Sequence, residues 1–383
     1  MSRANDNKNF LSSEDAVALR LRERLVRFPW GLMLLLTLAA CIGFIVLLSA
    51  VGKHNVNMLI SQVIRFSFTL ILMVVLAMAN EKVYRRYAYL VYGLILLMLT
   101  AVAVMGDIGM GARRWLEIGF VRLQPSEMMK AAIVLALARY FHDQSVAKLR
   151  LRDILIPLGI ILAPLVLIVH QPDLGTAVLL AVISGAVIFV AGLSWNAILA
   201  IFIIIPASTP LFWNLLHDYQ KRRILTLFFP EGDPLGAGYH IIQSKIAVGS
   251  GGLTGKGFMG GSQSHLDFLP ERHTDFIFSV LAEEWGFMGA MTLIVIYGLI
   301  TLRGLTIAAM ARDRFGLLLA SGLLSLFLFQ VVINIGMVIG LLPVVGIPLP
   351  LVSYGGSSMM TIMLAMGLLA HVSIHSKQHG RAV

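Results

Sequence analysis

Long uncharged stretches recur along the chain, separated by shorter polar segments. A helix needs about 20 mainly apolar residues to cross the hydrocarbon core of a bilayer. Ten stretches meet or approach that length, at roughly 30–51, 58–79, 87–105, 125–141, 154–170, 174–192, 197–215, 276–301, 315–340 and 354–373. The pattern therefore predicts an all-α polytopic membrane protein with about ten transmembrane helices.

Composition excludes the main alternatives to a membrane protein. Hydrophobic residues make up 58% of the chain and charged residues only 13%, whereas about 25% are charged in a typical soluble domain. A water-soluble surface cannot be built from so few charges, and disorder or a coiled coil would need more charge still. The single cysteine, Cys41, cannot form an internal disulfide.

The distribution of Lys and Arg predicts the orientation. With the amino terminus in the cytoplasm, eighteen of the thirty Lys and Arg residues fall on the cytoplasmic side, as the positive-inside rule requires. This assignment gives cytoplasmic tails at 1–29 and 374–383, a transmembrane domain at 30–373, and a large outer loop at about 216–275 between spans seven and eight. The polar residues 1–29 lack the features of a cleaved signal peptide.

The net charge of +10 fits attraction to anionic membrane lipid better than nucleic-acid binding, given the apolar content. The remaining twelve cations lie at or near the outer face: Lys53, Arg65, Arg113, Arg114, Arg122, Lys130, Lys221, Arg222, Arg223, Lys245, Lys256 and Arg272. Some would serve only loop solubility or anchor helix ends. Because ionisable residues at membrane depth usually have a function, we expect several to bind an anionic substrate.

Four ionisable residues stand where charge is costly. Glu127 and Lys130 are three residues apart, so they share one face of a helix and can pair. Asp173 and Asp275 each precede an apolar span, where capping the following helix is the simpler interpretation. Taken together, the four residues favour a polar cavity that opens to the outer face.

Two glycine-rich patterns in the large loop resemble nucleotide-binding motifs but do not qualify as such. The segment G-S-G-G-L-T-G-K-G at 249–257 lacks the first Gly and the final Ser or Thr of a phosphate-binding loop. Gly255, Gly257 and Gly260 fit a dinucleotide fingerprint, but no βαβ unit surrounds them. We therefore expect a flexible, tightly turning loop. The histidines of this loop lack metal-ligand spacing, so no metal site is predicted.

Two further segments are unusual for a membrane protein. Pro343, Pro348 and Pro350 precede S-Y-G-G-S-S at 353–358, which indicates non-helical backbone that must be buried in protein or face a polar cavity. Trp115 follows Arg113 and Arg114. It fits either an interfacial aromatic residue or the wall of a groove for a sugar or lipid head group.

Several of these segments together resemble the SEDS family (shape, elongation, division and sporulation) of membrane glycosyltransferases. The resemblance rests on G-A-R-R-W at 111–115, Q-P-S-E at 124–127, Q-P-D-L-G at 171–175, H-T-D-F-I-F at 273–278, A-E-E at 282–284 and P-L-V-S-Y-G-G-S at 350–357. The elongation branch of the family is the more similar, through D-P-L-G-A-G-Y-H at 233–240, L-P-E-R-H at 269–273 and L-P-V-V-G-I-P at 342–348.

The resemblance implies an activity and partners. It implies polymerisation of lipid II into a nascent glycan strand on the outer side of the bacterial cytoplasmic membrane, alongside a class B penicillin-binding protein and other membrane proteins of the elongation machinery. An α-linked diphosphate donor giving a β-linked glycan implies inversion without a covalent intermediate. No organic cofactor is implied, and the residues leave undecided whether Mg²⁺ or Mn²⁺ assists the diphosphate.

The resemblance also implies roles for particular residues. Asp275 matches the essential aspartate of the family and would act as general base. The expected substrate-binding residues are Arg113, Arg114, Trp115, Glu127, Lys130, Asp173, Lys245, Arg272 and Ser357. A flippase for the lipid-linked precursor remains the main alternative, because ten spans and a basic polar path suit it equally. A pure scaffold would leave the buried acids unexplained.

Overall fold

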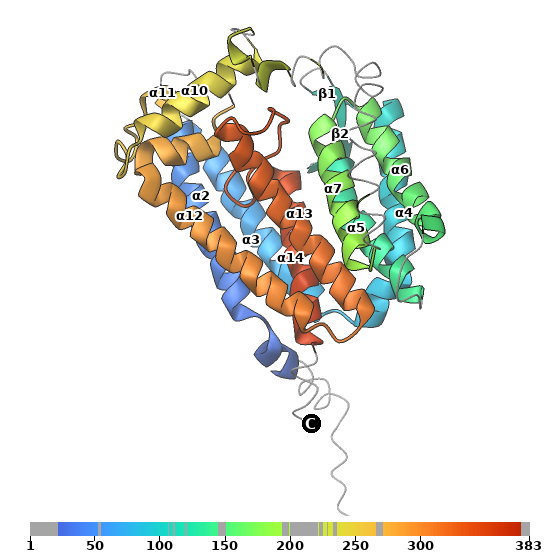
Figure 1. The fold of residues 1–383 in the computed structure, drawn as a ribbon. Helices are drawn as coiled ribbons and strands as arrows, with labels where there is room; N and C mark the ends of the chain where they lie inside the picture. The colour runs from blue at the N-terminus through green and yellow to red at the C-terminus, as the bar shows by residue number, and fades with distance from the viewer. Residues whose placement is uncertain are drawn as a thin grey trace, which may run out of the picture.

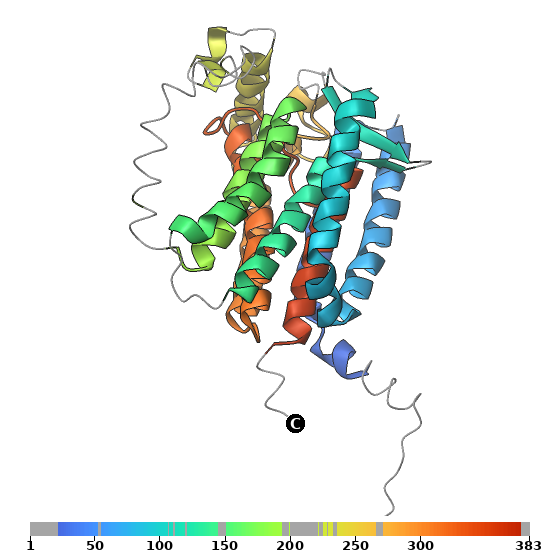
Figure 2. The same cartoon turned by 90° about the vertical axis from the view of Figure 1, so that its right-hand side faces the viewer.

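The computed structural model describes most of the chain. The described residues are 22–52, 55–105, 107–109, 112–118, 121–144, 151–193, 199, 221, 225–227, 229–232, 236–265 and 271–376. Nine long helices within these ranges form a bundle and lie side by side (Figures 1 and 2). They are α2 (Trp30–Val51), α3 (Val56–Met78), α4 (Glu81–Met105), α5 (Pro125–Asp143), α6 (Leu155–His170), α7 (Leu174–Val190), α12 (Ile277–Ala309), α13 (Arg314–Val338) and α14 (Gly356–Ile374).

Six helices of the described chain are long and apolar enough to cross a membrane: α2, α3, α4, α12, α13 and α14. Helices α6 and α7 are apolar but shorter, with 16 and 17 residues, and α5 carries the charges of Glu127, Lys130 and Arg139. These nine helices match nine predicted spans in order. The predicted span at 197–215 lies outside the described residues, so the count of ten stays a prediction.

The prediction was wrong at two helix boundaries and in one connecting segment. Helix α12 ends at Ala309 rather than at residue 301. Helix α4 begins at Glu81 rather than at residue 87, because charged side chains at a membrane surface do not end a helix and an acid in the first turn stabilises it. The segment between α4 and α5 contains a small antiparallel sheet of β1 (Asp107–Gly109), β2 (Ala112–Ile118) and β3 (Val121–Leu123), in that order. The chain is therefore not wholly α-helical.

The register of this sheet explains why a hydropathy pattern misses it. Gly109 pairs with Ala112 and Ile118 pairs with Val121, so only two residues separate the paired ends of each hairpin. The strands are too short for a clear alternating pattern, and their open edges require a position outside the hydrocarbon core. Figure 1 shows β1 at the upper end of the bundle. Helices α10 (Ala237–Ser250) and α11 (Ser262–His265) of the large loop lie at the same end.

The segment between α13 and α14 is non-helical, as predicted from its Pro and Gly residues, and most of it from Ile347 to Ser353 is buried. Ile347, Leu349, Leu351 and Val352 are each at most 2% exposed. Its carbonyls accept hydrogen bonds from side chains of three helices: Gln62 donates to Ser353 (2.9 Å), Tyr297 to Pro350 (2.7 Å), Gln330 to Pro348 (2.9 Å) and Asn334 to Ile347 (2.7 Å). Polar side chains from neighbouring spans thus replace the missing helical hydrogen bonds.

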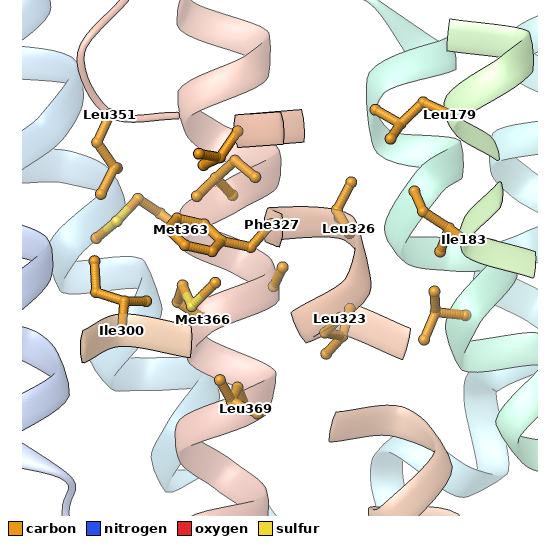
Figure 3. Close-up of a cluster of buried hydrophobic side chains, with 14 of the residues drawn as sticks. Leu179, Ile183, Ile300, Leu323, Leu326, Phe327, Leu351, Met363, Met366 and Leu369 are labelled. Carbon is orange, nitrogen blue, oxygen red and sulfur yellow. The ribbon is translucent and has the colours of Figure 1, made fainter. Parts of the chain in front are cut away.

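Apolar packing holds the helices around this segment. Figure 3 shows Leu323, Leu326 and Phe327 of α13 between Met363 and Met366 of α14 on one side and α7 on the other. These side chains are buried. Because lipid tails are as apolar as these side chains, close packing rather than the hydrophobic effect stabilises the bundle.

We predict that Gly43→Ala lowers the melting temperature of the protein. Gly43 lies in α2, and an added Cβ would lie 2.6 Å from the Cα of Val352 and 2.9 Å from the carbonyl oxygen of Leu351. Overpacking of this kind typically costs about 1–3 kcal/mol. Gly93→Ala in α4 is the matched control, because its added Cβ would meet no atom within 4 Å, and a helical Gly→Ala change alone favours the helix by about 1 kcal/mol. Equal melting temperatures for the two variants in detergent would contradict this prediction.

Candidate active site

The predicted pairing of Glu127 and Lys130 is confirmed. Both project from the first turns of α5 and are at most 5% exposed, and 2.6 Å separate Lys130 Nζ from Glu127 Oε1. The second carboxylate oxygen of Glu127 is buried and has no hydrogen-bond partner among the described residues. An isolated ion pair at this depth costs desolvation energy, so the unpaired oxygen favours a role beyond stability.

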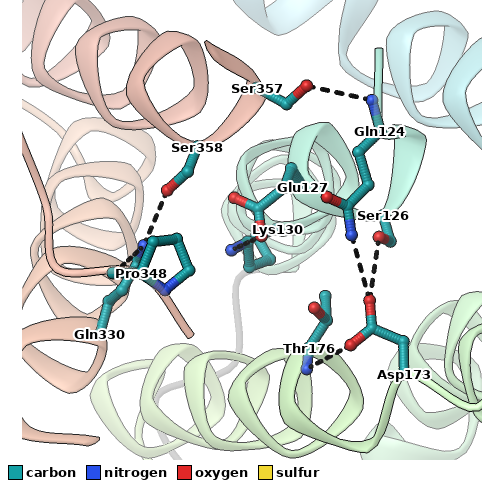
Figure 4. Close-up of polar contacts among 10 residues, drawn as sticks. All are labelled: Gln124, Ser126, Glu127, Lys130, Asp173, Thr176, Gln330, Pro348, Ser357 and Ser358. Carbon is teal, nitrogen blue, oxygen red and sulfur yellow. Dashed lines mark hydrogen bonds and ion pairs between the residues drawn. The ribbon is translucent and has the colours of Figure 1, made fainter. Parts of the chain in front are cut away.

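Asp173 combines two structural roles. Its Oδ1 caps α7 by accepting a hydrogen bond from the Thr176 amide at 3.3 Å, as the simpler interpretation of the sequence expected. Its Oδ2 accepts from Gln124 Nε2 at 3.2 Å and lies 3.5 Å from the Ser126 hydroxyl. The carboxylate therefore ties the start of α7 to the start of α5 (Figure 4).

The first turn of α14 joins the same group. The Ser357 hydroxyl accepts a hydrogen bond from the backbone amide of Gln124 at 3.2 Å. Gln330 of α13 donates to the Ser358 hydroxyl at 3.0 Å. Figure 4 shows Glu127 and Lys130 between these contacts and Asp173, so the first turns of α5, α7 and α14 and the middle of α13 converge on one polar cluster.

Asp275 lies directly before α12, beside the buried non-helical segment. Helix α12 has Phe276 as its N-cap residue and no side-chain cap, so the alternative interpretation of Asp275 as an N-cap is wrong. Its Oδ2 instead lies 3.3 Å from the position of an added Cβ on Gly346. Asn334 fixes the backbone here, because its side-chain amide donates to the carbonyls of both Asp275 (2.8 Å) and Ile347 (2.7 Å).

The non-helical segment connects Asp275 to the polar cluster. Gly346 lies against the Asp275 carboxylate, and Pro348, two residues later, accepts the hydrogen bond from Gln330. Ser353 donates to the carbonyl of Thr274 at 2.6 Å. Asp275 and the polar cluster are therefore both in contact with the non-helical segment between α13 and α14.

Two of the expected substrate-binding arginines make structural contacts. Arg114 donates to the carbonyls of Gln171 (3.2 Å) and Pro172 (2.5 Å), so it holds the turn that leads into Asp173. Arg272 donates to the carbonyl of Ala50 at 2.7 Å, near the carboxyl end of α2. Both guanidinium groups orient parts of the site through backbone carbonyls, which sequence reasoning did not foresee.

The other expected residues are more peripheral. Trp115 is half-buried in β2, opposite Asp107. Lys245 is exposed on α10, with its side chain against Gly340. The side chain of Arg113 lies outside what the structure describes. Within the described ranges, no group of three or more His, Cys, Asp and Glu residues could hold a metal ion.

The polar amides of the site were missed from the sequence. Gln62, Gln330 and Asn334 each lie inside an apolar span and are at most 1% exposed. A polar side chain inside a predicted span was the available signal, since such groups need a buried partner. Arg65 was counted among the outer cations without a specific role, and its guanidinium lies over the Tyr354 ring at 5.1 Å.

Comparisons with known proteins identify the family. The FtsW, RodA and SpoVE family model, described as cell cycle protein, matches residues 29–378. The chain therefore belongs to the SEDS family. Peptidoglycan glycosyltransferase MrdB of Escherichia coli is 45% identical over 352 residues, which cover 92% of this chain and 95% of the relative. Peptidoglycan glycosyltransferase RodA of Treponema pallidum is 34% identical, and the match covers 92% of this chain and 98% of the relative. These names confirm the predicted family and enzyme class.

Solved structures of SEDS proteins share the fold. A chain from a peptidoglycan synthase complex that coordinates polymerisation and crosslinking is 35% identical, with a TM-score of 0.79, covering 90% of this chain and 97% of that chain. The rod shape-determining protein RodA of Thermus thermophilus is 32% identical, with a TM-score of 0.70, and the match covers 92% of this chain and 98% of that chain. The helix arrangement is therefore that of a RodA-like SEDS protein.

We predict that the His273→Gln variant of this SEDS protein loses less thermal stability in acid than the wild type. Burial lowers the pKa of His273 below 6.5; the Arg272 charge lowers it further and Glu271 opposes the shift. A lowered pKa in the folded state means that the unfolded state binds the proton more readily. This contribution to stability is complete above pH 6.5 and is lost as the pH falls through the folded-state pKa. Melting temperatures between pH 7.5 and 5 measure the effect, and identical slopes for both proteins would refute it.

Proposed function

We propose that this protein polymerises lipid II into glycan strands at the outer face of the cytoplasmic membrane during cell elongation. The observation that carries the proposal is the placement of Asp275 beside a buried polar cluster with a paired lysine and an unpaired carboxylate oxygen. The family assignment and the names of the relatives support the same activity. Under this proposal the end of the bundle with β1, α10 and α11 faces outward.

Asp275 would act as the general base. In the proposed step it takes the proton of a sugar hydroxyl while that oxygen forms a bond to the anomeric carbon of the donor. The bond from the anomeric carbon to the diphosphate oxygen breaks on the opposite face, and the leaving diphosphate keeps the electron pair. Inversion follows from this single displacement. Asp275 is partly exposed, as a base that meets an outside substrate must be.

Positive charge would stabilise the leaving diphosphate. Lys130 is the cation nearest the centre of the polar cluster, and Lys245 is exposed toward the outer end. Arg113 and Trp115 would bind the head group from the sheet, with Ser357 and Asp173 ordering the cluster. Arg114 and Arg272 would act mainly by holding the backbone around it.

The proposal extends to topology and partner. Ten spans with both termini in the cytoplasm would put every proposed site residue on the outer side. A class B penicillin-binding protein would crosslink the strands made here, and the similarity to a chain from a peptidoglycan synthase complex supports this partnership. A flippase would need acids along a path across the membrane, whereas a transferase needs one placed at the reacting hydroxyl, and Asp275 fits the second requirement.

Exchange of the two charges on α5 tests the polar cluster. We predict that Glu127→Lys combined with Lys130→Glu inactivates polymerisation, although the pair could still form. The reason is that the exchange inverts the charges beside Asp173 and removes the unpaired carboxylate oxygen from its position. The rate of glycan formation by purified protein with its partner is the measurement, with folding checked by gel filtration. Recovery of half or more of the activity would leave the pair a purely structural role.

Asp275→Asn tests the general base. We predict a loss of about 10²–10⁴ in the polymerisation rate, which is the usual contribution of a general base. Melting temperature and partner binding should change little, because Asn keeps the shape of the side chain and leaves the carbonyl bond to Asn334 in place. Glu271→Gln is the matched control in the same turn, since its side chain accepts a hydrogen bond from Thr274 at 2.9 Å and an amide oxygen can still accept it. A near wild-type rate for Asp275→Asn would disprove the assignment, and lipid transfer across vesicles without any polymer would favour the flippase.

A further inference from the structure

Helix α12 is interrupted at Gly286, about ten residues after its start. Gly286 has φ 65° and ψ −163° inside the helix Ile277–Ala309. This backbone region is essentially restricted to glycine. The first turns of α12, which follow Asp275 directly, are therefore separated from the rest of the helix by a kink.

A stretch of the large outer loop is hydrogen-bonded into the break. In an unbroken helix the carbonyls of Glu283 and Glu284 would accept from the amides four residues later, those of Phe287 and Met288. Here these carbonyls accept from the loop amides of Lys256 and Gly257, both at 3.0 Å. The amides of Phe287 and Met288 donate instead to the loop carbonyls of Gly252 (2.9 Å) and Leu253 (3.1 Å). We call these contacts between 252–257 and 283–288 the loop seat.

The loop seat is tight and is reinforced by charge. An added Cβ on Gly286 would lie 2.3 Å from the Gly255 amide nitrogen, and one on Gly255 would lie 2.1 Å from the Glu284 carbonyl oxygen. Lys256 Nζ lies 2.7 Å from Oε1 of Glu283, whose side chain is fully buried. The amide of Gln263 donates to the same oxygen at 3.1 Å. The prediction of a flexible glycine-rich loop was therefore wrong for residues 252–257, because hydrogen bonds and an ion pair join them to α12.

The loop seat sets the direction of the segment that carries Asp275. Asp275 precedes Gly286 by eleven residues, or about 16 Å along a helix at 1.5 Å per residue. A change of about 20° in the kink would move Asp275 by roughly 6 Å, which is far more than a catalytic group tolerates, since about 1 Å of misplacement can cost 10² in rate. On its other side, Asp275 is held by Asn334, so the two contacts together define its position.

We propose that the loop seat is the positioning element for Asp275, with Gly286, Lys256 and Glu283 as positioning residues. This inference rests on the proposed function of Asp275 as general base. It assigns to the outer loop a role in aiming the base rather than in binding substrate. Lys256, counted from the sequence among cations that could meet an anionic substrate, has Glu283 as its partner instead.

The first test compares Gly286→Ala with Gly298→Ala in the same helix. Gly298 is the matched control, because an added Cβ there meets no atom within 4 Å. For Gly286→Ala we expect kcat for lipid II polymerisation to fall by about 10–100-fold, with KM within about twofold, because the polar cluster on α5, α7 and α14 is untouched. Gly298→Ala should match wild type. An unchanged kcat in Gly286→Ala, or a rise in KM alone, would overturn the inference.

The second test does not depend on how Gly286→Ala folds. Lys256→Met removes the charge that faces Glu283, and Lys256→Arg keeps it. We expect Lys256→Met to lower kcat several-fold and Lys256→Arg to restore most of it, with melting temperatures recorded for both. Hydrogen exchange at the Lys256 and Gly257 amides should rise at least tenfold in Lys256→Met, since they leave their acceptors. Equal kcat and equal exchange in Lys256→Met and wild type would overturn the inference.

Failure of this inference is distinguishable from failure of the proposed function. If wild type makes no polymer, the proposed function fails, and the exchange measurement still reports whether the loop seat exists. If wild type polymerises lipid II and the loop-seat variants do so at the same rate, the proposed function stands and the positioning role is disproved.

Discussion

The need to satisfy buried backbone groups inside a bilayer governs this structure. Residues Ile347 to Ser353 between α13 and α14 are non-helical and mostly buried, so their carbonyls need hydrogen-bond donors from other parts of the chain. Gln62, Tyr297, Gln330 and Asn334 do so from α3, α12 and α13. These bonds fix the packing of three helices and also hold the backbone of Asp275. The requirement for hydrogen bonding thus holds the backbone beside the proposed general base.

The charged residues follow the same logic. Glu127, Lys130 and Asp173 are each buried, and each has a partner on a helix end that belongs to the cluster. Arg114 and Arg272 donate to backbone carbonyls and so help to hold the turns beside the acids. At Gly286 the outer loop replaces helical hydrogen bonds in α12 with its own. Asp275 therefore lies between the non-helical segment that precedes α14 and the break at Gly286, and both are hydrogen-bonded by other parts of the chain.

The sequence indicated most residues of the candidate site but not the contacts that hold them in place. The motifs around Glu127, Asp173 and Asp275 were found because charge inside an apolar protein is rare and costly. Arg114 and Arg272 were expected to meet a substrate, because a sequence shows a cation but not the carbonyl within its reach. Gln330 and Asn334 were not recognised as site residues, because two neutral amides barely change the hydropathy of an apolar span.

The sequence by itself determined the membrane class, the positions of nine described helices, the i, i+3 pairing of Glu127 with Lys130 and the buried break after α13. All of these are local: hydropathy, helical periodicity and Pro or Gly content act over one span or one turn. Only the tertiary structure decided that Asp275 lies against Gly346 rather than capping α12, and that the loop 252–257 fills the break at Gly286. These contacts join residues far apart in the chain or depend on backbone angles, and local patterns do not encode the three-dimensional packing that selects them.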